Sequence, residues 1–297
     1  MKRIVLFAMT NIAVLALIGL ISYVFGLDRW LAARHMNIAM LLVISAIFGF
    51  AGSFISLAIS KWMAKMAYSI QVIEKPQTQD EEWLYRTVER LSRDAGISMP
   101  EIGYYESPEA NAFATGPSRN SALVAVSTGL LQQMNHREVE AVLAHEVGHI
   151  TNGDMVTMTL LQGVLNTFVG FFSRLIGMAI DNAMRRDNDR GGLGMGYMLG
   201  YFVSSIVLGL FAMVIQMAYS RQREFAADAM AAKLTDRESM IAALARLKSV
   251  MENGGVFDNS APSMNTFKIS HPESFMALFS SHPPLEKRIE ALRKLKS

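Results

Sequence analysis

Four long apolar segments constrain this 297-residue chain more than any other feature. A helix needs roughly 20 residues to cross the hydrocarbon core of a bilayer. Each of the four segments is at least that long, and they span residues 4–27, 36–60, 155–180 and 193–219. Only 18% of the residues are charged, against about 25% in a typical soluble domain. The sequence therefore predicts a mostly α-helical integral membrane protein with four transmembrane helices.

The apolar segments carry three further signals. The first follows Lys2 and Arg3 like a signal peptide, but its length and the lack of an Ala-x-Ala-like cleavage site favour an uncleaved anchor. The third contains Arg174 near its far end, where we expect the side chain to reach the headgroup region. The fourth opens with glycines at every fourth position, which predicts close packing against the third segment: Gly192, Gly196 and Gly200.

Two polar regions complete the chain, and both are expected on the same side of the membrane because an even number of crossings separates them. The predicted organisation is two N-terminal transmembrane helices (1–60), a first polar region (61–154), a transmembrane hairpin (155–219) and a second polar region (220–297). Basic residues near the segment ends slightly favour a cytoplasmic location for the polar regions. On that side lie Lys2, Arg3, Lys61, Lys65, Arg221 and Arg223, and on the other Arg29, Arg34, Arg185, Arg186 and Arg190.

Charge and cysteine content exclude several classes of function. The formal net charge is only +2, so the chain lacks the basic field that nucleic-acid binding needs. It contains no cysteine, which excludes disulfides, thiolate metal sites and thiol nucleophiles. A transition-metal site in this chain must therefore use histidine, aspartate and glutamate.

The first polar region shows three short apolar segments followed by a capped helix. Residues 102–105, 111–116 and 122–126 are separated by proline, glycine, serine and asparagine, as in strands of a small β-sheet. Asn135 followed three residues later by Glu138 is a variant of the capping box that starts a helix. The sequence Asn-Gly-Asp at 152–154 predicts its end.

The stretch "HEVGH" at residues 145–149 lies on this helix. Residues four apart project from the same helix face, so His145 and His149 can bind one Zn²⁺. Glu146 projects about 100° away, where it can take a proton from water without being a ligand. The alternative is a helix whose histidines only cap or pack.

A third ligand is expected from the second polar region, which begins with a helical pattern at 220–234. The third and fourth apolar segments form an antiparallel pair, so Glu224, just after the fourth, can return to His145 and His149. Asp228 shares the face of Glu224 and is a candidate to orient a ligand histidine. The alternative is an ordinary acidic helix face beside Arg221 and Arg223.

Four motifs together resemble the HtpX family of membrane-bound zinc metallopeptidases, which are related to the CAAX prenyl proteases. They are "EANAFATG", "VLAHEVGHITNGD", "SRQREFAAD" and "SHPPLEKRI", and the resemblance extends over the whole chain. It implies a zincin-like α+β catalytic domain with one zinc bound by His145, His149 and Glu224, and with Glu146 as the catalytic base. It further implies a bacterial inner-membrane enzyme whose site faces the cytoplasm and which degrades misfolded membrane proteins under stress.

Two motifs support weaker hypotheses. His282 is a candidate donor to the oxyanion formed during peptide hydrolysis, or part of a His-Pro-Pro turn before the last helix. Residues 111–116, with Asn111, Ala112 and Phe113, are a candidate edge strand on which an extended substrate lies, or an ordinary strand. Three further histidines have no partner at ligand spacing and are interpreted as loop or surface residues: His35, His136 and His271.

Three functions remain to be distinguished. The leading hypothesis is an endopeptidase that cuts polar segments of membrane proteins at the bilayer surface. An intramembrane protease would carry its metal-binding helix within an apolar segment, whereas residues 135–154 are polar and precede one. A non-enzymatic channel or scaffold would close the fourth position of a structural metal with another protein ligand, and His282 is the candidate for it.

Overall fold

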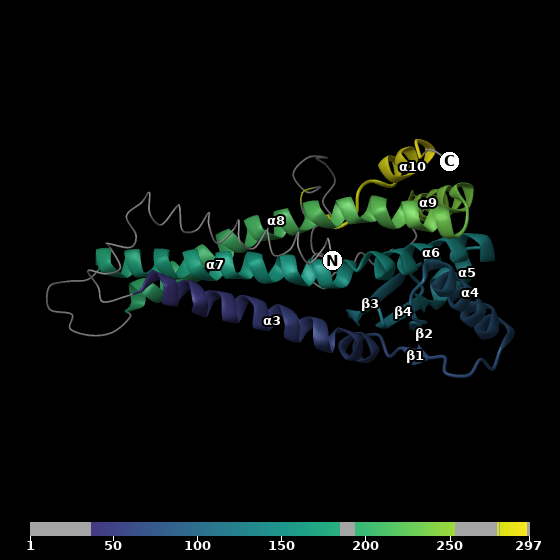
Figure 1. Cartoon of the computed structure of the whole chain (residues 1–297). Coiled ribbons are helices and arrows are strands. Elements are labelled where there is room, and N and C mark those ends of the chain that lie inside the picture. Colours follow the sequence, from purple (N-terminus) through teal and green to yellow (C-terminus); the bar gives the residue numbers. More distant parts are fainter. Residues whose placement is uncertain (1–36, 185–193, 253–277, 279, 296–297) are drawn as a thin grey trace. The chain divides into compact units, whose positions relative to one another are not determined.

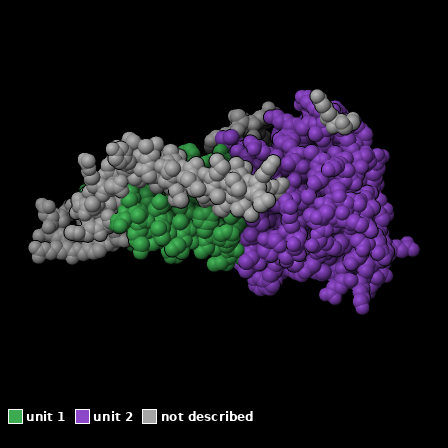
Figure 2. Space-filling view, viewed as in Figure 1, with its two compact units in different colours: residues 1–55, 158–216 green, residues 56–157, 217–297 purple. Residues whose placement is uncertain are grey.

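A computed structural model describes residues 37–184, 194–252, 278 and 280–295 of the chain (Figure 1). The chain divides into two compact units, coloured separately in Figure 2. Unit 1 comprises Met1–Ile55 and Met158–Gln216, and unit 2 comprises Ser56–Thr157 and Met217–Ser297. The units are described separately below.

Three helices of the described residues are long and apolar enough to cross a membrane: α3 (Ile38–Ala67), α7 (Asp154–Met184) and α8 (Met195–Leu234). They correspond to the second, third and fourth apolar segments of the sequence. The predicted first transmembrane helix, residues 4–27, lies outside the described residues, as does Gly192.

Small residues allow the helices of unit 1 to pack closely. A Cβ atom added to Gly49 of α3 would lie 2.7 Å from the backbone nitrogen of Thr167 on α7. A Cβ atom added to Gly200 of α8 would lie 3.0 Å from Cα of Gly177, also on α7. Together with Gly196, which approaches α7 equally closely, Gly200 confirms the predicted contact between the third and fourth segments.

Backbone and hydroxyl groups bind two ionisable side chains inside unit 1. Arg174 donates from Nη1 to the carbonyl of Gly170 at 2.8 Å and to Oγ of Ser45 at 3.3 Å. The buried carboxylate of Asp181 accepts from the backbone N–H groups of Gly194 and Tyr197, each at 3.1 Å. Asp181 therefore caps the first turn of α8, whose N–H groups have no partner within the helix.

Unit 2 contains a four-stranded mixed sheet with the order β1-β2-β4-β3. Its strands are β1 (Gln71–Val72), β2 (Glu101–Tyr105), β3 (Ala112–Ser118) and β4 (Ser121–Ser127). β2 and β4 are parallel, and the other two pairs are antiparallel. The three predicted strands match β2, β3 and β4 to within two residues, whereas β1 is too short to leave a pattern. β3 is an edge strand, because no strand of the described residues pairs with its outer side.

Five further helices surround this sheet: α4 (Gln79–Ala95), α5 (Thr128–Gln133), α6 (His136–Asn152), α9 (Arg237–Glu252) and α10 (Leu285–Arg293). α6 contacts β3, β4, α4 and α9, and α10 packs on α9. The core of unit 2 includes Val124 and Val126 of β4, Leu143 and Val147 of α6, and Leu244 of α9, all fully buried. These contacts fix α6 at the centre of the unit.

The helix predicted at 220–234 is not a separate element. It is the last part of α8, which runs without interruption for 40 residues from Met195 to Leu234. Residues 210–234 contain neither glycine nor proline, so nothing in the sequence breaks the helix after the apolar segment. This polar end of α8 belongs to unit 2.

Candidate metal centre

Local signals position the two histidines of α6. The Asn135 side chain accepts from the N–H of Glu138, and the Glu138 carboxylate accepts from the N–H of Asn135, each at 3.0 Å. This capping box and the left-handed Gly153 (φ 68°) at the other end confirm the predicted start and end of the helix. His145 and His149 lie within it, one turn apart.

Glycine at position 148 lets α8 approach α6 closely. A Cβ atom added to Gly148 would lie 3.1 Å from the carbonyl oxygen of Ala227 on α8. One turn before Ala227, Glu224 places Oε1 at 3.3 Å from Nε2 of His149 and Oε2 at 3.6 Å from Nε2 of His145. The structure thus brings together the three side chains for which the sequence predicted a common site.

The spacing of these groups fits a metal ion. Ligand atoms bound at about 2.0–2.1 Å to a tetrahedral ion lie about 3.3 Å from one another. The two histidine Nε2 atoms are 3.1 Å apart, and the ligand atoms of His145, His149 and Glu224 all lie within 4.8 Å of one another. Three protein ligands in such a group leave a fourth position for water or substrate.

Carboxylates orient both histidines from the opposite side of their rings. Nδ1 of His149 lies 2.7 Å from Oδ2 of Asp154, and Nδ1 of His145 lies 2.9 Å from Oδ1 of Asp228. Since a carboxylate only accepts, each Nδ1 carries a proton and each Nε2 is left with a lone pair when the ring is neutral. The Nε2 lone pairs of both histidines and the carboxylate of Glu224 then face the same small space. These atoms can together bind a cation.

Two arginines bind these orienting carboxylates. Arg223 donates from Nε to Asp154 at 2.6 Å. Arg288 of α10 donates from Nε and Nη2 to Asp228 at 2.8 and 2.6 Å and lies 3.0 Å from Oε2 of Glu224. The orienting position of Asp228 was predicted from the sequence, whereas the roles of Asp154, Arg223 and Arg288 were not. The signals were an aspartate directly after the helix-ending glycine and an arginine in the "SHPPLEKRI" motif.

Burial and neighbouring carboxylates both affect the pKa values of the site, and at the two histidines their effects oppose each other. Burial raises the pKa of Glu146 above its ordinary value. Burial alone lowers the pKa of His149, but hydrogen bonds with Asp154 and Glu224 outweigh it and raise the pKa to about 10. The pKa of His145 is also raised, because Asp228 and Glu224 outweigh its burial. The pKa of His149 means that its ring carries a second proton at neutral pH in the metal-free site, and a bound cation would take the place of that proton.

His282 contacts the carboxylate of Glu224. Its Nδ1 is 2.8 Å from Oε2 of Glu224, and its side chain is 54% exposed. The residue therefore lies at the border of the site and reaches Glu224 from the open side. This contact is compatible with both hypotheses for His282, a hydrogen-bond donor to the substrate oxyanion and a residue of the turn before the last helix.

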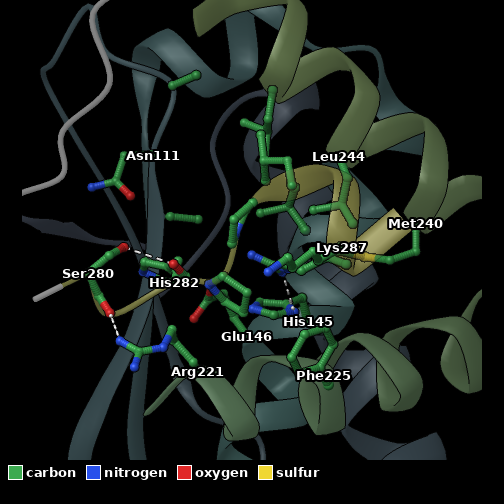
Figure 3. A pocket seen from close by; sticks show the side chains of 18 of the residues that line it. Asn111, His145, Glu146, Arg221, Phe225, Met240, Leu244, Ser280, His282 and Lys287 are labelled. Atoms are coloured by element: carbon green, nitrogen blue, oxygen red, sulfur yellow. Dashed lines mark hydrogen bonds between the residues drawn. The ribbon is translucent and has the colours of Figure 1, made fainter. Parts of the chain in front are cut away.

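A cavity of about 690 Å³ opens at the site (Figure 3). Its lining includes His145, Glu146 and His282, together with Asn111 and Ala112 at the start of β3. Phe113 is not part of the lining, and its ring lies 5.2 Å from that of Tyr68. Of the three residues named for the candidate substrate strand, Asn111 and Ala112 thus border the cavity and Phe113 does not.

Of the remaining histidines, His136 lies among the described residues. His136 is the exposed first residue of α6 and stacks on Trp83, with ring centroids 4.2 Å apart. This agrees with its interpretation as a surface residue. His35 and His271 lie outside the described residues.

Comparison with known proteins identifies the family. Residues 78–296 match the model of peptidase family M48. The chain belongs to this family. A protease HtpX homolog of Methylacidiphilum infernorum is 55% identical over 99% of both chains. Protease HtpX of Aeromonas hydrophila is 52% identical over 99% of this chain and 100% of its own. The resemblance to HtpX is therefore confirmed, and the chain is a membrane-bound metalloprotease rather than a non-enzymatic scaffold.

The fold has a counterpart among solved structures. The crystal structure of Ste24p from S. mikatae superimposes with a TM-score of 0.59 at 20% sequence identity, covering 98% of this chain and 66% of that one. This similarity supports the predicted combination of membrane-spanning helices with an α+β unit. The chain is thus a multi-pass membrane protein of the M48 family.

Proposed function

We propose that this metalloprotease is a zinc-dependent endopeptidase in which His145, His149 and Glu224 hold one zinc ion. The observation that carries the proposal is the spacing of the three ligand groups. The Nε2 atoms of His145 and His149 are 3.1 Å apart, and Oε1 of Glu224 lies 3.3 Å from Nε2 of His149. The two orienting carboxylates support it, because metal-binding histidines usually donate their other ring N–H to such a group. Zinc is preferred because nitrogen and carboxylate ligands in a tetrahedral arrangement suit it.

Glu146 is proposed as the general base. When bound, the zinc ion supplies Lewis acidity that polarises a carbonyl group and acidifies water. Glu146 borders the same cavity as His145, so its carboxylate can accept the proton of the attacking water and pass it to the leaving amine. Burial raises the pKa of Glu146 above its ordinary value, which makes its carboxylate a stronger base for the proton of water.

His282 and Asp228 have proposed supporting roles. Asp228 holds the ring of His145 at 2.9 Å and thereby fixes the direction of Nε2. His282 lines the cavity beside Glu146, where a ring N–H can donate to the oxyanion that forms on the substrate carbonyl. Its Nδ1 contact with Glu224 fixes the ring while leaving Nε2 for this role.

The edge strand β3 is the proposed binding surface for the substrate main chain. Asn111, Ala112 and Phe113 begin or precede a strand whose outer side pairs with no strand of the described residues. An extended peptide can add to such an edge by main-chain hydrogen bonds. Asn111 and Ala112 border the cavity that also contains His145, so a peptide bound there passes the proposed metal position. Phe113 then contributes only backbone groups.

We infer that the enzyme works in the bacterial inner membrane with unit 2 in the cytoplasm. The similar HtpX proteins come from bacteria, and the basic residues near the segment ends favour this orientation. The proposed substrates are misfolded or damaged membrane proteins under stress, cut at their polar segments. The lipid bilayer is the proposed environment, and no nucleic-acid partner is expected from a net charge of +2.

Replacement of Glu146 by glutamine in the detergent-purified protein tests the proposal. We expect zinc to stay bound while casein is no longer cut, because glutamine has nearly the same shape but cannot take up a proton. Glu238, an exposed residue of α9, provides the matched control, and Glu238→Gln should leave both properties unchanged. Undiminished casein cleavage by Glu146→Gln would remove this residue from the mechanism.

A further inference from the structure

Ser127 lies where the sheet of unit 2 passes into a helix. It is the last residue of β4 and the N-cap of α5, and it is fully buried. Ser127 itself does not border the cavity, but two of its hydrogen-bond partners do. They are Leu130 of α5 and Asn111, which directly precedes β3 and is labelled in Figure 3. The proposed function assigns Ser127 no role.

The hydroxyl of Ser127 makes three hydrogen bonds. Its oxygen accepts from the N–H of Asn111 at 2.9 Å and from the N–H of Leu130 at 3.0 Å. It donates its proton to the carbonyl of Glu109 at 2.5 Å. A serine hydroxyl has one donor and two acceptor positions, so these bonds use its full capacity and fix its orientation.

One of these bonds extends the pairing of β3 with β4 by one residue. The paired residues run as far as Ala112 and Val126, so Asn111 and Ser127 come next. The N–H of Ser127 donates to the carbonyl of Asn111 at 2.9 Å, as in an antiparallel sheet. The return bond would need the carbonyl of Ser127, but the carbonyl of an N-cap residue already accepts the first bond of its helix. The hydroxyl takes its place, so Ser127 holds both main-chain groups of Asn111.

The earlier part of the loop that leads to β3 is held independently of this hydroxyl. The carbonyl of Ser107 accepts from the N–H of Gly129 at 2.8 Å, and the carbonyl of Pro108 accepts from Nε2 of Gln133 at 2.8 Å. Loss of the Ser127 hydroxyl would therefore loosen residues 109–111 and leave the rest of the loop attached to α5. A strand end that loses its hydrogen bonds opens locally, and a peptide that binds there must first order it.

We propose that Ser127 is a positioning residue for substrate binding. Its hydroxyl fixes the beginning of the substrate strand at the cavity, so that an extended peptide finds this part of the edge already ordered. The inference rests on the proposed function, in which β3 binds the substrate main chain. It adds the group that keeps this edge in place next to the metal centre.

A series of peptides tests the role on the full-length, zinc-loaded protein in detergent. A casein fragment cut by the wild type is shortened one residue at a time from each end. The ratio of kcat/KM between the longest peptide and the shortest that is still cut measures the contribution of the substrate strand. In Ser127→Ala we expect this ratio to fall by roughly 3- to 10-fold, mainly through KM, because the strand end is no longer held. Zinc affinity should stay unchanged, and Ser127→Thr, which keeps the hydroxyl, should restore the ratio.

Two further variants isolate the hydroxyl of Ser127. Thr128→Val removes the neighbouring hydroxyl, which binds the N–H and the carbonyl of Ser107 at 3.2 and 3.1 Å, and should leave the ratio unchanged. Ser127→Cys keeps the shape of the side chain with a weaker donor and acceptor. It should give an intermediate ratio, and it replaces Ser127→Ala if that variant does not fold. Because each measurement is a ratio between two peptides, a partial loss of folded protein does not affect it.

The possible results separate this inference from the proposed function. A wild-type preference for long peptides that Ser127→Ala and Ser127→Cys leave unchanged would overturn the role of Ser127 and leave the endopeptidase intact. An equal reduction of the ratio by Thr128→Val, or by Ser127→Thr, would overturn it as well. A wild type that cuts long and short peptides equally would overturn the substrate strand together with this inference. Absence of any Glu146-dependent cleavage would overturn the proposed function as a whole.

Discussion

Units 1 and 2 both bury ionisable side chains, but they satisfy them in different ways. In unit 1, Arg174 binds the carbonyl of Gly170 and the hydroxyl of Ser45, and Asp181 binds backbone N–H groups at the start of α8. In unit 2, His145 is bound to Asp228, which is bound to Arg288. The difference separates two uses of buried charge. The groups of unit 1 join helices, and those of unit 2 aim ring nitrogens at a common point.

Loss of a proposed ligand should have the largest effect. Glu224→Ala removes the carboxylate that lies 3.3 Å from Nε2 of His149 and 3.6 Å from Nε2 of His145, so zinc affinity should fall by more than about 100-fold. Gln222→Ala, an exposed position of the same helix, is the control and should bind zinc normally. Competition with a chromophoric chelator measures the affinity, and an unchanged value for Glu224→Ala would refute the ligand assignment.

Loss of an orienting carboxylate should have the next largest effect. Asp154→Ala and Asp228→Ala free the ring of one histidine each, which should weaken zinc binding by about 10- to 100-fold. Asp181→Ala removes an equally buried carboxylate from unit 1 and should leave the affinity unchanged. Equal losses of zinc affinity in all three variants would show that the contrast between the units is not one of metal binding.

Zinc binding should depend on pH because the ion must displace a proton. In the metal-free protein, the pKa of His149 is raised from 6.5 to about 10. Its protonated form therefore stabilises the metal-free fold fully below pH 6.5 and loses this contribution as the pH rises towards about 10. Over the same interval, zinc affinity should increase by up to about tenfold per pH unit. Calorimetry in buffers of different ionisation enthalpy counts the released protons, and release of none would contradict the assignment.

Two glycine substitutions should have the smallest effects, but they should separate zinc affinity from the stability of unit 1. Gly148→Ala places a Cβ atom 3.1 Å from the Ala227 carbonyl and should move α6 away from α8 by a few tenths of an ångström. We expect zinc affinity to fall several-fold, with a loss of about 1–2 kcal/mol in stability. Gly200→Ala, where the added atom meets Gly177 at 3.0 Å, should destabilise unit 1 without changing zinc affinity. Thermal unfolding and chelator competition measure the two effects.

Local patterns in the sequence predicted much of this arrangement. The capping box at Asn135 and the glycine at 153 defined α6, and the glycines of α8 predicted its contact with α7. The meeting of Glu224 with the histidines followed from the antiparallel apolar segments. In each case the controlling interaction lies within one helix or one hairpin.

Interactions between distant segments were harder to predict. Arg288 reaches Asp228 across 60 residues, and no local pattern indicates which carboxylate an arginine will bind. Asp154 was interpreted only as part of a helix end, although it also orients His149. The continuity of α8 was missed because its composition changes from apolar to polar at residue 220, while its helical propensity does not.

Zinc K-edge X-ray absorption of the wild type and of His282→Ala tests the central claim most directly. Two imidazoles, one carboxylate and one exchangeable oxygen should surround the zinc ion in both proteins, with bonds of about 2.0–2.1 Å. This result would establish the open position that hydrolysis requires. A wild-type spectrum with three imidazoles that falls to two in His282→Ala would show a closed structural site and contradict the account.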